Sequence, residues 1–267
     1  TTVSALIHAA TMVNAGIYIL ARMAPAFVAV DGWTTALLYL GGITALVAAI
    51  MAVVEPDLKR LLAYSTISQL GYMVFALGLG IGGVFVSQFH LLNHSIFKAL
   101  LFLCAGAIIH SVGTRNMYEM RGLKQEMPKT RWIMLFGALA LAGIPIFSGF
   151  WSKDLIFAGA FEQELWIPLI LVVVTAMLTF AYSLRMYFLV FEGEPKKERH
   201  AHETPGIMLF VLGILAVGAI ASWALVEIFS SAFSEFQLAG ADFTTHYLAE
   251  FVTHTFTSTA FILSLVG

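Results

Sequence analysis

Charge is what this sequence has least of. Only 11% of its 267 residues are charged, whereas 60% are hydrophobic and the mean hydropathy is +0.88. Soluble domains usually carry about 25% charged residues, so most of these side chains cannot face bulk water. Several runs approach the ~20 apolar residues that span a bilayer as a helix. The composition excludes an ordinary soluble domain and predicts an integral membrane protein.

Cysteine and nucleotide-binding motifs are also scarce. Cys104 is the single cysteine, which excludes an intrachain disulfide and a Cys-ligated iron–sulfur cluster within this chain. Its apolar setting favours a buried small hydrophobe over a reactive thiol. No G-x-G-x-x-G motif follows a strand, no P-loop lysine is present, and the net charge of −2 lacks a basic stripe for nucleic acid. We therefore expect no cofactor, no metal and no nucleic acid on this chain.

The apolar runs, and the glycine, proline and charged residues that separate them, predict an all-α, polytopic transmembrane bundle of about eight to nine spans. One run is interrupted by Gly143, Pro145 and Gly149, which favours two half-helices with an unwound middle over one smooth rod. The chain begins and stops inside apolar segments, so we interpret it as an internal piece of a longer polypeptide. The expected spans cover about 3–22, 34–54, 61–81, 84–110, 132–161, 167–190 and 207–229, with a last one starting near 255.

Threading these spans alternately across a membrane separates the basic residues. The loops 55–60, 112–131 and 192–205 fall on one side and hold ten of the fourteen Lys and Arg residues, whereas the other side holds only Arg22. Such an asymmetry places the first side in the cytoplasm or an organelle matrix. Arg185 lies near the end of its span, where a long side chain can reach the same interface.

The stretch "HLLNHSIFKALL" places His90, His94 and Lys98 four residues apart in an otherwise apolar run. On a helix they form one polar row about 12 Å long, with Lys98 near the middle of its span. Insertion of a lysine at that depth costs roughly 2.5–3.5 kcal/mol, so a purely structural role is a poor explanation. Lysine and histidine side chains that exchange protons would make this row a relay. Metal binding by the two histidines is the alternative, although no third ligand stands nearby.

Other ionisable residues are open to two interpretations. Lys153 and Asp154 follow the interrupted run, where unwound backbone at membrane depth requires water or protein around it, and we expect a water-filled half-channel there. His8 is either a core histidine or part of a polar path. On composition alone, Lys59 in "EPDLKR" belongs to a cytoplasmic interface loop.

Four segments in order carry a family resemblance: "TTVSALIHAATMVNAGIYILAR", "EPDLKRLLAYSTISQLGYM", "FHLLNHSIFKALLFL" and "PIFSGFWSKDLIFAGAF". Together they resemble the antiporter-like, proton-pumping membrane subunits of respiratory complex I, in particular the L-type subunit (chain 5). Related subunits occur in Mrp sodium/proton antiporters, deazaflavin-dependent dehydrogenases and membrane-bound hydrogenases. The resemblance is dense from residue 1 to about 190 and thin afterwards.

The resemblance implies an inverted-repeat fold with broken helices and two half-channels joined by buried lysines. Residues 1–230 would be a partial antiporter-like domain, mostly its second repeat, and residues 231–267 an interfacial segment followed by the start of another span. It also implies that His8 belongs to a central hydrophilic axis and that Lys59 is a relay residue, against the composition-only interpretation. The implied relay set is Lys98, Lys153, Lys59, His90, His94 and His8.

The expected function is that of a proton-translocating subunit of an NADH–quinone oxidoreductase, or of a deazaflavin-linked relative, with no redox site in this chain. The resemblance implies that flavin, iron–sulfur clusters and quinone reside in partner subunits, and that the partners are other membrane and peripheral subunits together with membrane lipid. We expect a bacterial or archaeal cell membrane rather than the mitochondrial inner membrane. The alternatives are an Mrp-type or hydrogenase-type antiporter-like subunit and a scaffold with an inactive channel. The family's upstream Glu–Lys pair is absent, so this piece would not pump alone.

Overall fold

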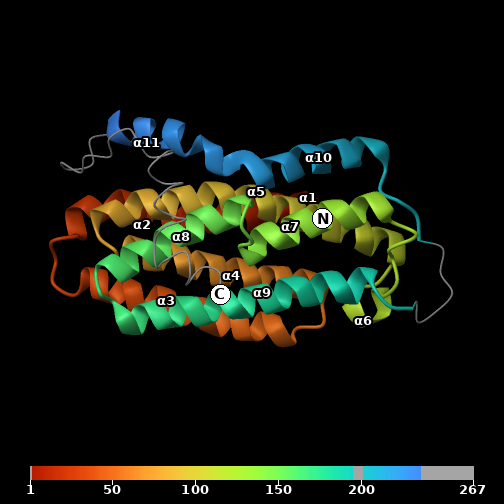
Figure 1. Cartoon of the computed structure of the whole chain (residues 1–267), viewed down its shortest axis with the longest axis horizontal. Helices are drawn as coiled ribbons and strands as arrows, with labels where there is room; N and C mark the ends of the chain where they lie inside the picture. The colour runs from red at the N-terminus through yellow and green to blue at the C-terminus, as the bar shows by residue number, and fades with distance from the viewer. Residues whose placement is uncertain (1, 195–200, 236–267) are drawn as a thin grey trace.

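The computed structural model describes residues 2–194 and 201–235, and within these ranges every regular element is a helix (Figure 1). An isolated backbone bridge joins Asp57 and Asn116. The elements are α1 (Thr2–Ala5), the π-helix η1 (Leu6–Ala10), α2 (Met12–Phe27), α3 (Trp33–Val54), α4 (Leu58–Leu77), α5 (Ile81–Val112), α6 (Met117–Met120), α7 (Pro128–Ala142), α8 (Ser148–Glu162), α9 (Trp166–Phe191), α10 (Gly206–Ala221), the 3₁₀ turn η2 (Ser222–Leu225) and α11 (Val226–Glu235).

The long helices lie along one common axis, as membrane spans do (Figure 1). In the described part of the chain, four helical segments are long and apolar enough to cross a membrane: Trp33–Val54, Ile81–Val112, Trp166–Phe191 and Gly206–Ser230. At 1.5 Å per residue, the 32 residues of α5 extend about 48 Å, well beyond the ~30 Å hydrocarbon core. The prediction of an all-α, multi-pass membrane protein is confirmed.

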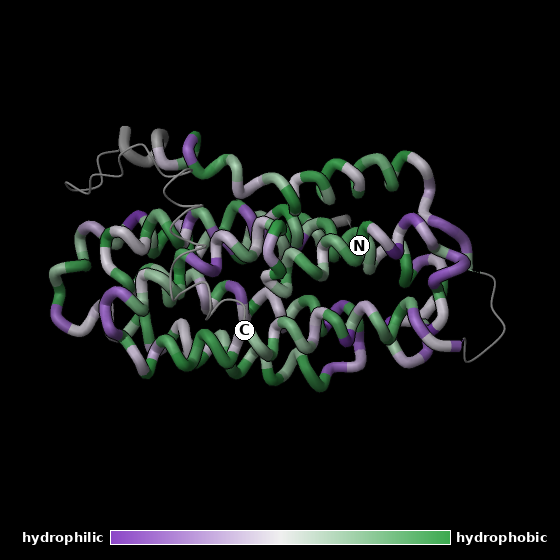
Figure 2. Tube along the Cα trace, in the orientation of Figure 1, coloured by the Kyte–Doolittle hydropathy of each residue, from purple (hydrophilic) through white to green (hydrophobic). Residues whose placement is uncertain are grey.

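Basic loops lie together at one end of the bundle. The segment 55–57 is tied to the loop after α5 by hydrogen bonds from Leu58 N to Arg115 O and from Met117 N to Pro56 O, both 3.0 Å. Lys124 N donates to Phe191 O over 3.2 Å, which adds the end of α9 to the same cluster. Figure 2 shows many hydrophilic residues gathered at the ends of the bundle. The predicted alternation of the spans across the membrane therefore agrees with the fold.

Helices α3 and α4 pack with unusually close backbones. The buried face of α3 consists largely of small residues, among them Gly41, Gly42 and Ala45. A Cβ atom on Gly41 would lie 2.7 Å from Gly71 O of α4, and one on Gly71 would lie 2.6 Å from Ala45 N. Small residues bring membrane helices into such contact, where dispersion replaces the hydrophobic effect as the driving force.

The interrupted run is broken as predicted. Helix α7 ends at Ala142, and α8 begins at Ser148 after a turn in which Gly143 has φ = 84°. Ile146 also has a positive φ, 89°, a conformation that is strained for a β-branched residue. The break therefore contains both a relaxed left-handed residue and a strained one.

Three other expectations differ from the structure or lie beyond it. The first span is not smooth: η1 and a bend at Thr11 interrupt it, and α2 continues to Phe27 rather than ending at Arg22. The expected polar loop 112–131 contains the short helix α6, and α7 begins inside it at Pro128. Within 231–267, only α11 up to Glu235 belongs to the described residues, so the interfacial segment and the last span lie outside them.

Candidate functional site

Helix α5 carries a buried row of three ionisable side chains through the centre of the bundle. His90, His94 and Lys98 are each 0% exposed, although lysine is among the residue types least often buried. The helix is delimited by glycines with positive φ, Gly80 before it and Gly113 after it. It packs against α4, α7, α8 and α10, so neighbouring helices enclose the row.

Lys98 has a hydroxyl partner on α4. Its Nζ donates to Ser65 Oγ over 2.5 Å, and Ser65 Oγ in turn donates to Leu62 O over 2.9 Å. Helix α4 is held at its start by Asp57, whose carboxylate accepts from the backbone N–H groups of Lys59 and Arg60. This N-cap anchors the first turn of the helix that positions Ser65.

His90 has a partner on each side of its ring. Its Nδ1 lies 2.8 Å from Ser152 Oγ on α8, and its Nε2 lies 3.1 Å from Gln69 Oε1 on α4. His90 therefore joins α4, α5 and α8 in one hydrogen-bonded layer. Gln69 and Ser152 are themselves fully buried.

His94 lies between these two layers and has a different environment. Its ring centroid is 6.3 Å from that of His90, and it meets the Phe97 ring edge-on at 5.4 Å. Neither ring nitrogen has a hydrogen-bond partner among the described residues. Buried polar groups normally have a partner, so this ring requires water or a second orientation to satisfy its nitrogens.

Lys153 extends from α8 back across the helix break. Its Nζ donates to Leu141 O in the last turn of α7 over 2.7 Å and lies 5.8 Å from the centroid of the Tyr72 ring. Carbonyls at a helix C-terminus lack intrahelical partners and carry partial negative charge, which favours a cation there. A Cβ on Gly143 would lie 3.4 Å from this Nζ, so the glycine at the break leaves room for the lysine.

The four groups form one electrostatic set. Lys153 lies close enough to His90, His94 and Lys98 to interact with them electrostatically, and Lys98 interacts with His94 in the same way. The sequence does not show that Lys153 lies near the α5 row, because Lys153 follows Lys98 by 55 positions. The tertiary structure thus brings together four of the six predicted relay residues.

The other two predicted residues lie elsewhere. Lys59 is partly exposed in the first turn of α4, six residues before Ser65, so about 9 Å of helix separates the two. The backbone of His8 belongs to η1, but its side chain is outside the described part of the structure. Asp154, next to Lys153, is buried with 3% exposure. Arg185 reaches the charged end, where Nη1 donates to Glu55 O over 3.0 Å.

Several polar partners in the site were not identified from the sequence. Ser65, Gln69 and Tyr72 of α4 follow one another at helical spacing on the face toward α5, and Ser152 precedes Lys153 on α8. These residues are neutral, so no buried charge marks them in the sequence. A stripe of polar side chains at i, i+4 and i+7 in an otherwise apolar span was the signal that could have found the α4 partners.

Within residues 2–194 and 201–235, no group of three His, Cys, Asp or Glu side chains is placed to hold an ion. Cys104 is fully buried in the apolar core.

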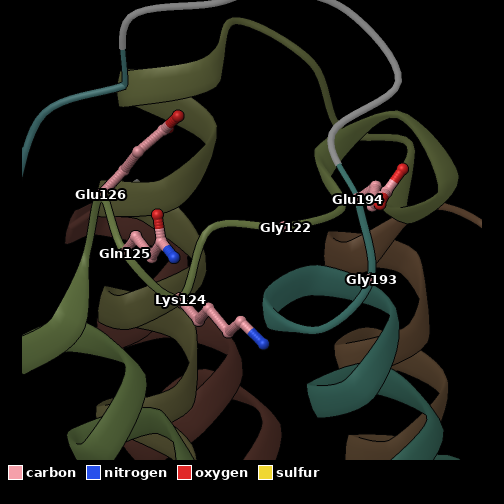
Figure 3. A pocket seen from close by; sticks show the side chains of 6 residues that line it. All are labelled: Gly122, Lys124, Gln125, Glu126, Gly193 and Glu194. Atoms are coloured by element: carbon pink, nitrogen blue, oxygen red, sulfur yellow. The ribbon is translucent and has the colours of Figure 1, made fainter.

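A surface pocket of about 410 Å³ lies at the charged end of the bundle (Figure 3). Residues of the loop before α7 and of the turn after α9 line it, including Lys124, Glu126 and Glu194. Lys124 pairs with Glu192 at 3.2 Å, and Arg131 pairs with the same carboxylate at 2.9 Å. This pocket is a feature of the loop surface, separate from the buried row.

Comparison with known proteins identifies the fold family. The family model described as "NADH:quinone oxidoreductase/Mrp antiporter, TM" matches residues 1–179. Over its whole length the chain is similar to a protein in the solved Mrp complex from Dietzia sp., with a TM-score of 0.80 and 32% identity, and it covers 30% of that protein.

Curated relatives agree with this assignment. The chain is 49% identical over 241 residues to F(420)H(2) dehydrogenase subunit L of Methanosarcina mazei, an alignment that covers 85% of this chain and 36% of the relative. It is 43% identical over 236 residues to NADH-quinone oxidoreductase subunit L of Rhodobacter capsulatus, covering 82% of this chain and 33% of the relative. The chain thus spans about a third of the length of these relatives. It belongs to the NADH:quinone oxidoreductase/Mrp antiporter transmembrane family.

Proposed function

We propose that this chain is part of a proton-translocating membrane subunit of a redox-driven complex, either an NADH–quinone oxidoreductase or a deazaflavin-linked relative. In this proposal, protons move along the buried α5 row and between that row and Lys153. Flavin, iron–sulfur clusters and quinone reside in partner subunits, and this chain contributes no redox group. The names of the similar proteins support the class of complex.

One observation carries the proposal: Lys98, His94, His90 and Lys153 are buried together in the interior of a membrane protein. An ionisable group at that depth is costly, so its default interpretation is an ion or proton pathway. A carboxylate partner for each lysine would indicate a structural ion pair. Lys98 and Lys153 instead donate their hydrogen bonds to a hydroxyl and a carbonyl. Neither partner neutralises the charge.

The residues have distinct roles in this mechanism. Lys98 and Lys153 hold protons at two stations. His94 and His90 exchange protons between them, because each imidazole has one nitrogen that can accept a proton and one that can release it. The hydroxyls of Ser65 and Ser152 both donate and accept, so they extend the path to α4 and α8. Lys59 and His8 would connect this core to the charged end and to the preceding part of the subunit.

The test uses the full-length subunit assembled in its complex and reconstituted into vesicles. Lys98→Ala and Lys153→Ala should lower the number of protons moved per electron pair, whereas Lys129→Ala, on the exposed start of α7, should not. Retained electron transfer to quinone shows that the complex is assembled. Unchanged proton movement in both buried-lysine variants would refute the relay and support a scaffold role.

An Mrp-type sodium/proton antiporter subunit is the second candidate. The similarity to the Mrp complex protein extends over the whole chain and favours it as an alternative. The subunits that copurify after mild solubilisation separate the two: flavin and iron–sulfur proteins indicate the redox complex, and small membrane subunits alone indicate the antiporter. Sodium-dependent proton exchange without an electron donor would also indicate the antiporter.

A further inference from the structure

The hydrogen bonds of His90 determine which ring nitrogen carries its proton. Gln69 Oε1 lies 3.1 Å from His90 Nε2, and a carbonyl oxygen can only accept a hydrogen bond. His90 Nε2 therefore carries a hydrogen. In the neutral ring Nδ1 is then an acceptor. The single hydroxyl hydrogen of Ser152 is donated to it over 2.8 Å, a shorter contact than the 3.2 Å to the alternative acceptor, Ser148 O.

The two sides of this ring lead to groups of different chemistry. Ser152 both donates and accepts, so it can receive a proton and pass one on toward α8, the helix of Lys153. The amide of Gln69 accepts a hydrogen bond but has no ionisable proton to exchange at neutral pH. Helix α4 thus places a hydroxyl, Ser65, opposite Lys98 and an amide opposite His90.

Behind Gln69 lies a second group of hydroxyls that the relay does not include. The Tyr182 hydroxyl of α9 lies beside the side chains of Gln69, Ser68 and Thr179, without full hydrogen-bond geometry. All four residues are completely buried. Gln69 therefore separates His90 from hydroxyls that could themselves conduct a proton between α4 and α9.

We propose that Gln69 is a positioning residue that insulates the relay. It holds the Nε2 hydrogen of His90 and offers no group on that side that could take up a proton, so protons move among His90, Ser152 and His94 and do not leak toward the hydroxyls around Tyr182. This inference rests on the proposed function, because it assigns a direction of exchange to one relay residue. It explains why two histidines that look equivalent in sequence differ: among the described side chains, His90 has a partner on both sides of its ring and His94 has none.

The decisive variant is Gln69→Glu in the full-length subunit within its complex. The carboxyl group has nearly the shape of the amide and keeps an acceptor for His90, but it can take up and release a proton. We expect the passive proton leak of vesicles without electron donor to rise at least ~tenfold. This is a conservative minimum, because a positioned proton-transfer group typically changes a rate by 10²–10⁴-fold. Fewer protons should be moved per electron pair at an unchanged electron-transfer rate.

Two further variants separate insulation from a structural role. Gln69→Met removes the acceptor without adding a proton carrier, so it should slow pumping without a leak, whereas a structural role would make Met more harmful than Glu in every assay. Adding Tyr182→Phe to Gln69→Glu removes the Tyr182 hydroxyl and should suppress the leak. Gln163→Glu, at the end of α8 where the amide donates to Leu79 O over 3.0 Å, is the matched control.

A leak in Gln69→Glu no larger than in Gln163→Glu would overturn the inference. If Gln69→Glu does not assemble, Gln69→Ser decides the question, because it introduces an uncharged hydroxyl at the same position and should also leak. The two proposals fail separately. If the Lys98→Ala and Lys153→Ala variants pump fewer protons but the Gln69 variants show no added proton leak, insulation alone is rejected. If both lysine variants pump normally, the relay itself is rejected.

Discussion

The contact between α3 and α4 makes Gly41→Ala the most informative test of the packing. A Cβ on Gly41 would lie 2.7 Å from Gly71 O, 2.8 Å from Phe75 Cα and closer still to Phe75 N, whereas ordinary contacts are 3.4–4 Å. The obstacle is backbone, which cannot rotate away as a side chain can. The two helices would therefore have to separate by more than about 0.7 Å, which weakens dispersion along the whole interface.

Overpacking of this kind costs typically about 1–3 kcal/mol, and a backbone obstacle favours the upper part of that range. Gly213→Ala on α10 is the matched control, because no heavy atom lies within 4 Å of its Cβ position. Alanine there should be neutral or stabilising by up to about 1 kcal/mol, since it has the higher helix propensity.

The assay is the folded fraction of the purified full-length subunit as denaturant is added, together with the amount of assembled complex in membranes. Gly41→Ala should be less stable than Gly213→Ala by about 2–3 kcal/mol. Combining Gly41→Ala with Gly71→Ala should cost less than the sum of both, because one helix displacement relieves both clashes. Equal stability of Gly41→Ala and Gly213→Ala would refute the close α3–α4 contact.

Four other predictions follow from single contacts. Ser152→Ala removes the hydroxyl at His90 Nδ1 and should lower the protons moved per electron pair, whereas Ser152→Thr, which keeps a hydroxyl, should retain more of them. Asp57→Ala removes the N-cap of α4 and should destabilise the subunit by about 1 kcal/mol in a denaturant titration; no change would mean that water caps this helix equally well. Ser222→Ala removes the 2.6 Å hydrogen bond to buried Asn93 and should cost about 1–3 kcal/mol in the same titration. Glu192→Gln weakens two surface ion pairs and should cost less than ~1 kcal/mol, decreasing further at high salt; a larger loss would show that the pairs are shielded in the complex.

Much of the fold could be predicted because the bilayer imposes strong constraints on the sequence. The third expected span, 61–81, corresponds to α4 at Leu58–Leu77, and the fourth, 84–110, corresponds to α5 at Ile81–Val112. Gly143 and Pro145 correctly indicated the break between α7 and α8. The irregular first helix was missed, because its break at Thr11 has neither a glycine nor a proline to mark it.

The site was less predictable. His90, His94 and Lys98 could be placed on one row because a fixed helical period relates them. Their partners could not, since Ser65 and Gln69 come from one neighbouring helix and Ser152 from another. The relay roles of all six predicted residues stay predictions until the variants are measured.

The sequence by itself determined the environment and the local geometry: long apolar runs require a membrane, and the helical period aligns the α5 row. Only the tertiary structure decided which ionisable groups share one electrostatic environment and which nitrogen of His90 faces a hydroxyl or an amide. The reason is physical. Hydropathy and periodicity are properties of a segment, whereas burial and hydrogen-bond partners depend on how several segments pack.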